Sequence, residues 1–302
     1  MDRRFLFIIT AVCSLIGIRE QGFSYEFEMY DENFSNECCG NNESPWVARI
    51  EAAGAVGQFI GQKHNYLELG LFGGPAPSDD LFFFVDARGY WLEKNRHAAS
   101  VGGGIRMLSR SCGTSRIWGA NLYYDYNEGK HKGFNQIGIG LESLGACLDF
   151  RVNAYIPIET KACSSSRTYS YPDGWEWQIR EREFSYKGVD GEIGYRLWQY
   201  CNFTVYGAAG PYYYHSKGPH QNVYGGQIRL EARYLDYVTL EARFSDDNRY
   251  HAEVQGKLII SIPIDQLMGC FSYDRCRAFF TQPVKRNGLA FFDHCCNAKW
   301  NW

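Results

Sequence analysis

Between residues 46 and 264, apolar and polar side chains alternate in one short segment after another. Residues 148–156 read LDFRVNAYI, so Leu, Phe, Val, Ala and Ile share one face while Asp, Arg, Asn and Tyr share the other. A β-strand separates such sets because its side chains have a period of two, whereas an α-helix has a period of about 3.6 residues and would mix them. Residues 227–234, 238–244 and 251–262 repeat the pattern. The alternation therefore predicts an all-β fold.

Three features of these segments favour a membrane barrel over a soluble sandwich. Many segments run for ten residues or more, whereas soluble strands commonly have about five or six residues and tilted membrane strands need about 9–11. The polar faces mix Arg with Glu and Asp, as a water-filled lumen would. Aromatic residues form 17% of the chain and gather near segment ends, as in residues 90–91, 123–124 and 212–214, where outer-membrane barrels carry aromatic girdles. The segments therefore predict a closed antiparallel transmembrane β-barrel.

The number of segments is compatible with closure. About twelve can be counted, and they start near Val47, Asn65, Leu81, His97, Arg116, Gly133, Ala146, Phe184, Cys201, Asn222, Asp236 and Tyr250. An even number brings both ends of an antiparallel barrel to the same side of the membrane. Closure matters because each unpaired backbone group in hydrocarbon costs several kcal/mol, so an open sheet edge would not persist there.

The charged residues of the alternating segments are expected on the inner face of the barrel. The lumen-facing set is Asp86, Arg88, Asp149, Arg151, Asp190, Glu192, Arg229, Glu231, Arg233, Glu241, Arg243, Glu253 and Lys257. The apolar residues that alternate with them, such as Val254 and Leu258, are expected to contact lipid.

The N-terminus predicts export. Arg3 and Arg4 precede a short apolar run over residues 5–18, and small residues follow at positions 22 and 24. This is the pattern of a secretory signal peptide, which we place at residues 1–24. No later apolar run reaches the length of a membrane helix. We then expect a short periplasmic segment at 25–45, the barrel at 46–264 and a cysteine-rich tail at 265–302, in the bacterial outer membrane.

Export also sets the expected orientation of the barrel. The N-terminus stays in the periplasm, so the first strand runs outward and the long connection 159–183 lies outside the cell. This connection is the best candidate for an exposed contact loop. It contains a serine run, a Pro-Asp-Gly turn, Trp175 and Trp177. The expected partners are outer-membrane lipid and, through this loop, a host-cell surface.

Cysteines are numerous after the signal peptide. The candidate disulfide residues are Cys38, Cys39, Cys112, Cys147, Cys163, Cys201, Cys270, Cys276, Cys295 and Cys296. Exported proteins meet an oxidising compartment, so these residues are expected to form disulfides. Because neighbouring cysteines rarely bond each other, the two adjacent pairs favour bonds elsewhere or to other envelope proteins. A zinc site from Cys270, Cys276, His294 and Cys295 is the alternative, which lacks a close CxxC pair.

No spacing in the sequence predicts catalysis, a metal site or a cofactor. The seven histidines fall mostly at expected turns and loops. Asp173 and His215 could meet at the outer rim, yet no motif brings together a nucleophile, a base and an orienting group. The three glycines at 102–104 lack the Lys-Ser/Thr and the strand-to-helix context of a phosphate loop. A net charge of -3 supplies no broad basic surface for nucleic acid. We therefore expect a protein that is not an enzyme.

A block in the middle of the chain resembles a known family. Residues 119–126 read GANLYYDY and residues 138–142 read GIGLE. Residues 150–157 read FRVNAYIP, residues 188–195 read GVDGEIGY and residues 284–290 read VKRNGLA. Together these segments resemble the barrel domain of inverse autotransporters, the intimin/invasin-type outer-membrane translocators, over roughly residues 81–293.

The resemblance implies a twelve-stranded barrel that the barrel-assembly machinery inserts, with a linker that crosses the lumen and leads to an exported adhesin. The matching linker residues are Lys285, Arg286 and Asn287. Their charges are expected to pair with lumen carboxylates such as Asp86, Glu192, Glu231 or Glu241. The tail at 265–302 is shorter than one immunoglobulin-like repeat, so a long passenger is not expected, and the tail then threads the pore or plugs it.

The sequence thus predicts an adhesin-type outer-membrane barrel that anchors the chain, displays a short segment, or joins other envelope proteins through disulfides. Two alternatives remain open. The same barrel with an open lumen would be a porin-like, solute-conducting channel. A secreted soluble β-sandwich that binds carbohydrate through exposed aromatic residues would show the same alternation.

Overall fold

The computed structural model describes residues 45–301, apart from a few positions. Those left out within this range are 61, 79, 112–113, 130–132, 159–163, 174, 201, 217–221, 236 and 265–279. The predicted signal peptide and the segment 25–45, except for its last residue, lie outside the described part. Among the described residues, no helix combines the length and the apolar character needed to cross a membrane.

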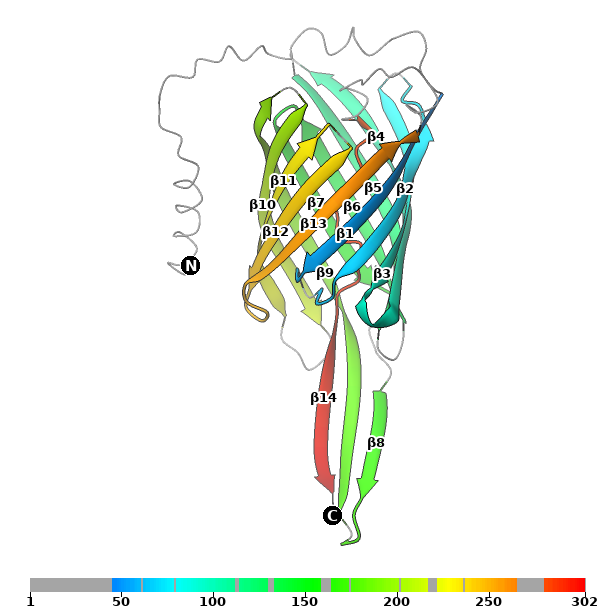
Figure 1. Ribbon diagram of the computed structural model, residues 1–302, viewed down its shortest axis with the longest axis vertical. Helices are drawn as coiled ribbons and strands as arrows, with labels where there is room; N and C mark the ends of the chain where they lie inside the picture. The colour runs from blue at the N-terminus through cyan, green and yellow to red at the C-terminus, as the bar shows by residue number, and fades with distance from the viewer. Residues whose placement is uncertain are drawn as a thin grey trace, which may run out of the picture.

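Twelve antiparallel strands form a closed barrel (Figure 1). They are β1 (Trp46–Gly57), β2 (Tyr66–Pro75), β3 (Leu81–Leu92), β4 (Arg96–Ser111), β5 (Thr114–Glu128), β6 (Gly133–Gly145), β7 (Leu148–Pro157), β9 (Glu176–Tyr200), β10 (Phe203–Ser216), β11 (Val223–Tyr234), β12 (Val238–Asp247) and β13 (Glu253–Pro263). One short 3-10 turn, η1 (Glu93–Asn95), joins β3 to β4. The barrel closes because β13 pairs with β1, from Pro263 opposite Arg49 to Gln255 opposite Gly57. The prediction of a closed barrel of about twelve strands is confirmed.

The barrel has two ends that differ in their connections. We call the end where β1 begins and β13 finishes the near end, and the opposite end the distal end. The turns at the near end are short, as between Gly145 of β6 and Leu148 of β7. The connection from β7 to β9 is the longest at the distal end, and it contains a further strand.

The period of two places the two kinds of side chain on opposite faces of the barrel wall. On β13, Val254 and Leu258 expose 57% and 47% of their surface on the outside, whereas Glu253 and Lys257 are buried inside. A ring of exposed apolar side chains in water would be unfavourable, while in a bilayer the same ring contacts hydrocarbon. The wall therefore has the polarity of a membrane barrel.

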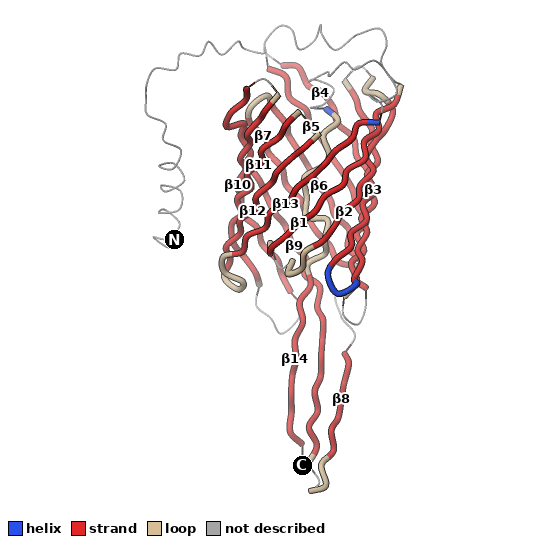
Figure 2. The backbone as a smooth tube through the Cα atoms, in the orientation of Figure 1, coloured by secondary structure: helices blue, strands red, loops and turns tan. Residues whose placement is uncertain are grey.

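A narrow three-stranded sheet extends beyond the distal end (Figures 1 and 2). It consists of β8 (Ser164–Ser170), the first half of β9 and β14 (Phe292–Asn301), with β9 in the middle. We call this sheet the ribbon. The prediction that 159–183 forms a loop is wrong over 164–170 and 176–183, because β9 runs without interruption for 25 residues. At about 3.3 Å per residue, a strand of this length is far longer than a bilayer of about 30 Å requires.

Candidate functional site in the barrel lumen

Residues 280–291 cross the inside of the barrel from one end to the other. Phe280 and Val284 belong to an apolar cluster at the near end, together with Val47 and Phe82. Phe291 belongs to a second cluster of buried residues, Phe59, Ile60, Tyr155, Tyr186, Tyr212, Tyr214 and Val223, most of which lie at the distal end. We call residues 280–291 the lumen segment; in Figure 1 it is the red trace inside the barrel. Twelve extended residues reach about 40 Å, which is enough to pass a hydrocarbon core of about 30 Å.

Arg106 of β4 holds the lumen segment at the near end. Its side chain is 0% exposed. One terminal nitrogen donates to the carbonyl oxygens of Phe280 at 2.8 Å and Gln282 at 2.6 Å. Its Nε donates to Glu142 at 2.7 Å. The carboxylate of Glu142 offsets the guanidinium charge. The arginine can therefore donate hydrogen bonds to backbone carbonyls that have no partner within the extended segment.

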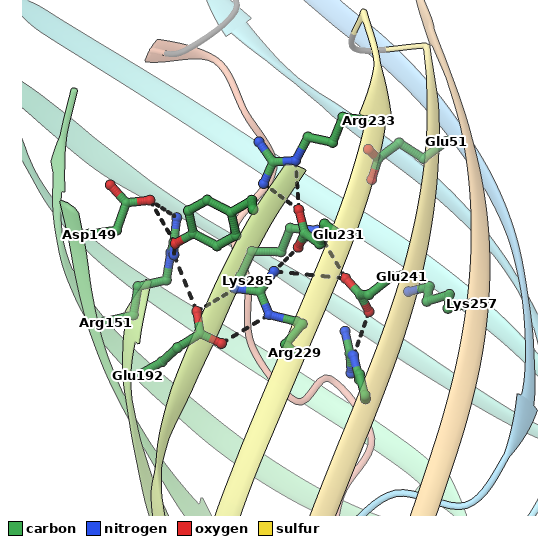
Figure 3. A network of polar contacts seen from close by, with 12 residues as sticks. Glu51, Asp149, Arg151, Glu192, Arg229, Glu231, Arg233, Glu241, Lys257 and Lys285 are labelled. Carbon is green, nitrogen blue, oxygen red and sulfur yellow. Dashed lines mark hydrogen bonds and ion pairs between the residues drawn. The ribbon is translucent and has the colours of Figure 1, made fainter. Parts of the chain in front are cut away.

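Lys285 lies between two carboxylates of the barrel wall (Figure 3). Its Nζ is 3.0 Å from Glu231 of β11 and 3.3 Å from Glu241 of β12. Each glutamate also forms an ion pair with an arginine of its own strand, Glu231 with Arg233 and Glu241 with Arg243. The lysine therefore joins an ion cluster that the wall has already assembled.

Arg286 pairs with a second site on the wall. Its guanidinium donates to both oxygens of Asp125 on β5, one of them at 2.8 Å. It also donates to Ser100 at 3.1 Å, and it lies over the ring of Tyr123 with 4.3 Å to the centroid. A side chain at position 138 would meet this guanidinium, so Gly138 provides the room that the arginine occupies.

The distal end holds the last part of the segment through hydrogen bonds and ring contacts. The backbone N–H of Asn287 donates to the hydroxyl of Tyr155 at 2.8 Å, and Asn127 donates to the carbonyl of Ala290 at 3.1 Å. The ring of Phe291 stacks on Tyr186 with 4.4 Å between centroids. The segment is thus fixed along its whole length.

Several other wall charges form ion pairs with one another. Glu192 receives Arg151 and Arg229, and Figure 3 shows this group beside Lys285. Arg88 lies 2.8 Å from Glu68 and 3.0 Å from Asp86, while Lys257 donates to Glu68 at 2.5 Å. Buried charges are costly unless they are paired and hydrogen-bonded. These ion pairs offset the cost of burying their charges inside the barrel.

A cavity lies beside the lumen segment. A cavity of about 80 Å³ lies between residues 282–289 and the wall, where it is lined by Glu68, Arg88, Arg243 and Lys257. In the described structure, the lumen segment therefore occupies the path that a solute would take.

The structure places all thirteen predicted lumen residues on the inner face, each buried or half-buried. Of the four predicted partners of the linker, Glu231 and Glu241 contact Lys285, while Asp86 and Glu192 bind wall arginines. Arg286 binds Asp125, which the sequence reasoning did not single out. The period of two could have found it, since Asp125 follows the inward-facing Tyr123 by two residues on β5.

Most of the cysteines predicted to form disulfides lie outside the residues that the structure describes. Cys38, Cys39, Cys112, Cys163, Cys201, Cys270 and Cys276 lie at positions that the structure leaves out, and only the backbone of Cys295 and Cys296 is described, on β14. Cys147 is described as a free, half-buried thiol, so it forms no disulfide with another described residue. In the same described ranges, no group of three or more His, Cys, Asp and Glu residues is arranged to hold a metal ion.

Comparisons with known proteins agree with this architecture. Residues 68–206 match the family described as "Inverse autotransporter, beta-domain". No curated protein sequence matches the chain.

Solved structures also match the chain. One chain, from the work described as "Unveiling the Mechanism Behind the in-meso Crystallization of Membrane Proteins", has 14% identity and a TM-score of 0.59, with 82% of this chain and 100% of that chain covered. The KdgM porin has 7% identity and a TM-score of 0.43, over 70% of this chain and 97% of that one. The β-domain of the Bordetella autotransporter BrkA has 10% identity and a TM-score of 0.32, over 73% and 99%. By the family match, residues 68–206 are similar to the inverse autotransporter β-domain, and the barrel is one of the bacterial outer membrane.

Proposed function

We propose that the barrel anchors the chain in the outer membrane and holds the lumen segment across the pore. The ribbon, which includes the C-terminal strand β14, then lies outside the cell. One observation carries this proposal. Residues 280–291 run from the near-end cluster to the distal cluster, and both cations of the segment, Lys285 and Arg286, have carboxylate partners on the wall.

The proposed orientation rests on the predicted signal peptide at residues 1–24. Export would leave the chain that precedes β1 in the periplasm, which makes the near end periplasmic and the distal end external. Short near-end turns and a longer distal connection agree with outer-membrane barrels in general, which have short periplasmic turns and longer outer loops. The lumen segment then enters from the periplasm and leaves outside.

The contacts of the lumen segment favour anchoring and display over conduction. Arg106 donates to backbone carbonyls of the segment, and Asp125 and Glu231 bind its cations. A porin-like channel would have to release these contacts and leave wall charges and carbonyls without partners. Buried polar groups that lose a partner cost about 1–3 kcal/mol each, and charged groups cost more. The segment therefore acts as a resident part of the barrel.

Several finer parts of the proposal concern partners. The barrel-assembly machinery inserts the barrel, and cysteines of the N-terminal segment and the tail link the protein to other envelope components. The outer ribbon contacts a host-cell surface. We assign no catalytic step to any residue.

Surface labelling tests the proposed topology. A short epitope inserted after Asp173, in the turn between β8 and β9, should bind antibody on intact cells. The matched epitope after Leu235, in the near-end turn between β11 and β12, should bind only after the outer membrane is permeabilised. Labelling of the Leu235 epitope on intact cells, or failure of the Asp173 epitope to label them, would overturn the proposal.

A further inference from the structure

Four aromatic residues lie on either side of the turn that ends the ribbon. Tyr169 and Tyr171 are on the β8 side, and Trp175 and Trp177 are on the β9 side. Tyr169 is opposite Trp177 in the register, and the N–H of Tyr171 donates to the carbonyl oxygen of Trp175 at 2.8 Å. The four residues therefore form two facing pairs.

All four side chains share one face of the hairpin. Residues directly opposite each other in an antiparallel pair point to the same side, and so do residues two apart on one strand. The rings of Tyr169 and Trp177 confirm the placement, with 6.4 Å between their centroids. We call these four residues the aromatic face.

The aromatic face is accessible, and the other side of the hairpin is polar. Tyr169 and Tyr171 expose 47% and 46% of their surface, and the two tryptophans are half-buried. The opposite face carries the side chains of Ser166, Thr168, Ser170, Glu176 and Gln178. A stable strand pair in water would gain little from exposing two large rings, so this face is suited to contact with another molecule.

We propose that the aromatic face binds a glycan outside the cell. The face of an aromatic ring carries negative charge density. A pyranose ring presents C–H bonds on one face and hydroxyl groups around its edge, so it can lie flat on such a ring while its hydroxyls reach polar neighbours. Arg167 and the phenolic hydroxyl of Tyr169 offer donors at the border of the face. Tyr and Ser, with Trp and Arg at the strongest contacts, are also enriched in the binding loops of antibodies.

The size and charge of the face argue against other partners. A stable protein interface buries about 800 Å² on each side and engages about 20–30 residues, and four side chains are far short of this. A target membrane would be met by the apex of the hairpin, where Asp173 is exposed, and Glu176 is exposed beside it. Carboxylates are repelled by anionic lipid surfaces and are costly to bury in the interface. A flat sugar needs only the lateral face.

The position of the face fits a ligand beyond the membrane surface. Ser185 lies next to Tyr186, which still pairs with the barrel strand β10. Trp177 is eight positions before Ser185, which places the aromatic face about 26 Å past the rim at about 3.3 Å per residue. This inference rests on the proposed function, because the ribbon must be outside the cell to meet such a ligand.

The test is binding of the purified, detergent-solubilised full chain to an array of bacterial and animal glycans. The double variant Tyr169→Ala/Trp177→Ala should weaken binding to the bound glycans about tenfold or more, because it removes one facing pair of rings. Trp177→Phe keeps a ring and should retain most of the binding. Thr168→Ala alters the polar face of the same strand and should bind like the wild type.

Two further measurements make each outcome decisive. Heat-modifiable gel mobility shows that each variant contains a folded barrel, and the Asp173 epitope shows that its ribbon is outside. Absence of glycan binding by the wild type, equal binding by Tyr169→Ala/Trp177→Ala, or binding to phosphatidylcholine vesicles in place of glycans would each overturn the inference. If the epitope is labelled on intact cells and no glycan binds, the inference fails while the proposed topology stands.

Discussion

Arg286 and Asp125 are 161 residues apart in the chain, and they form a bidentate ion pair inside the barrel. One guanidinium nitrogen of Arg286 lies 2.8 Å from Oδ1 of Asp125. Asp125 belongs to the wall and Arg286 to the lumen segment. Both side chains are almost fully buried. A planar guanidinium that meets both oxygens of a carboxylate fixes the position and the orientation of its partner. The pair therefore sets the register of the lumen segment against the wall.

Breaking this pair from one side should destabilise the barrel. Asp125→Ala leaves the Arg286 guanidinium buried without its main counter-charge, a change that costs about 3–5 kcal/mol in comparable buried pairs. The check is the temperature at which the compact gel form of the detergent-extracted protein converts to the unfolded form. Asp173→Asn, in an exposed turn, should leave that temperature unchanged. The double variant Asp125→Ala/Arg286→Met should recover much of the loss, and an additive double variant would contradict direct coupling.

Reversing the charge at Lys285 should open the pore. Lys285→Glu places a third carboxylate beside Glu231 and Glu241, and the repulsion should displace the middle of the lumen segment. Planar-bilayer recordings should then show larger and less steady currents than the wild-type protein gives. Lys285→Arg keeps the charge and serves as the control. A wild-type protein that already conducts steadily at the level of Lys285→Glu would mean that the segment does not block the pore.

Adding a side chain at Gly138 should act through Arg286. A Cβ there would meet the guanidinium of Arg286, so Gly138→Val should displace the arginine from Asp125 and lower the unfolding temperature. Gly256→Ala is the matched control, because a Cβ at that position has nothing within 4 Å. If Arg286→Met removes most of the effect of Gly138→Val, the clash is the cause. Equal effects in both backgrounds would assign the cost to the strand itself.

The lipid-facing assignment predicts a difference between neighbouring residues of β13. Leu258→Arg puts a cation into hydrocarbon and should cost about 2–4 kcal/mol near the middle of the bilayer. Lys257→Arg, one residue away in the lumen, keeps its charge beside Glu68 and should be much milder. Reversible unfolding by guanidinium in the presence of lipid vesicles measures both changes. Similar losses at both positions would contradict the assignment of the two faces.

The sequence by itself determined the barrel and its polarity. A period of two fixes which side chains share a face, and closure follows because hydrocarbon supplies no hydrogen bonds to an open edge. Residues such as Glu192 and Arg229 could therefore be placed in the lumen without coordinates. Short turns, as at Gly145, marked strand ends equally well, since turn chemistry is local.

Only the tertiary structure decided the path of the C-terminal segment and the nature of the long distal connection. Lys285 could have met any of several carboxylates, because ion pairing depends on distance across the lumen and leaves no trace in sequence spacing. The ribbon was not predicted either. Its central strand β9 continues past the bilayer because β8 and β14 form hydrogen bonds with it on both sides. Strand pairing joins residues that are distant in sequence. The sequence of β9 alone therefore does not show that this part of the chain is a strand, because its partner strands must be known first.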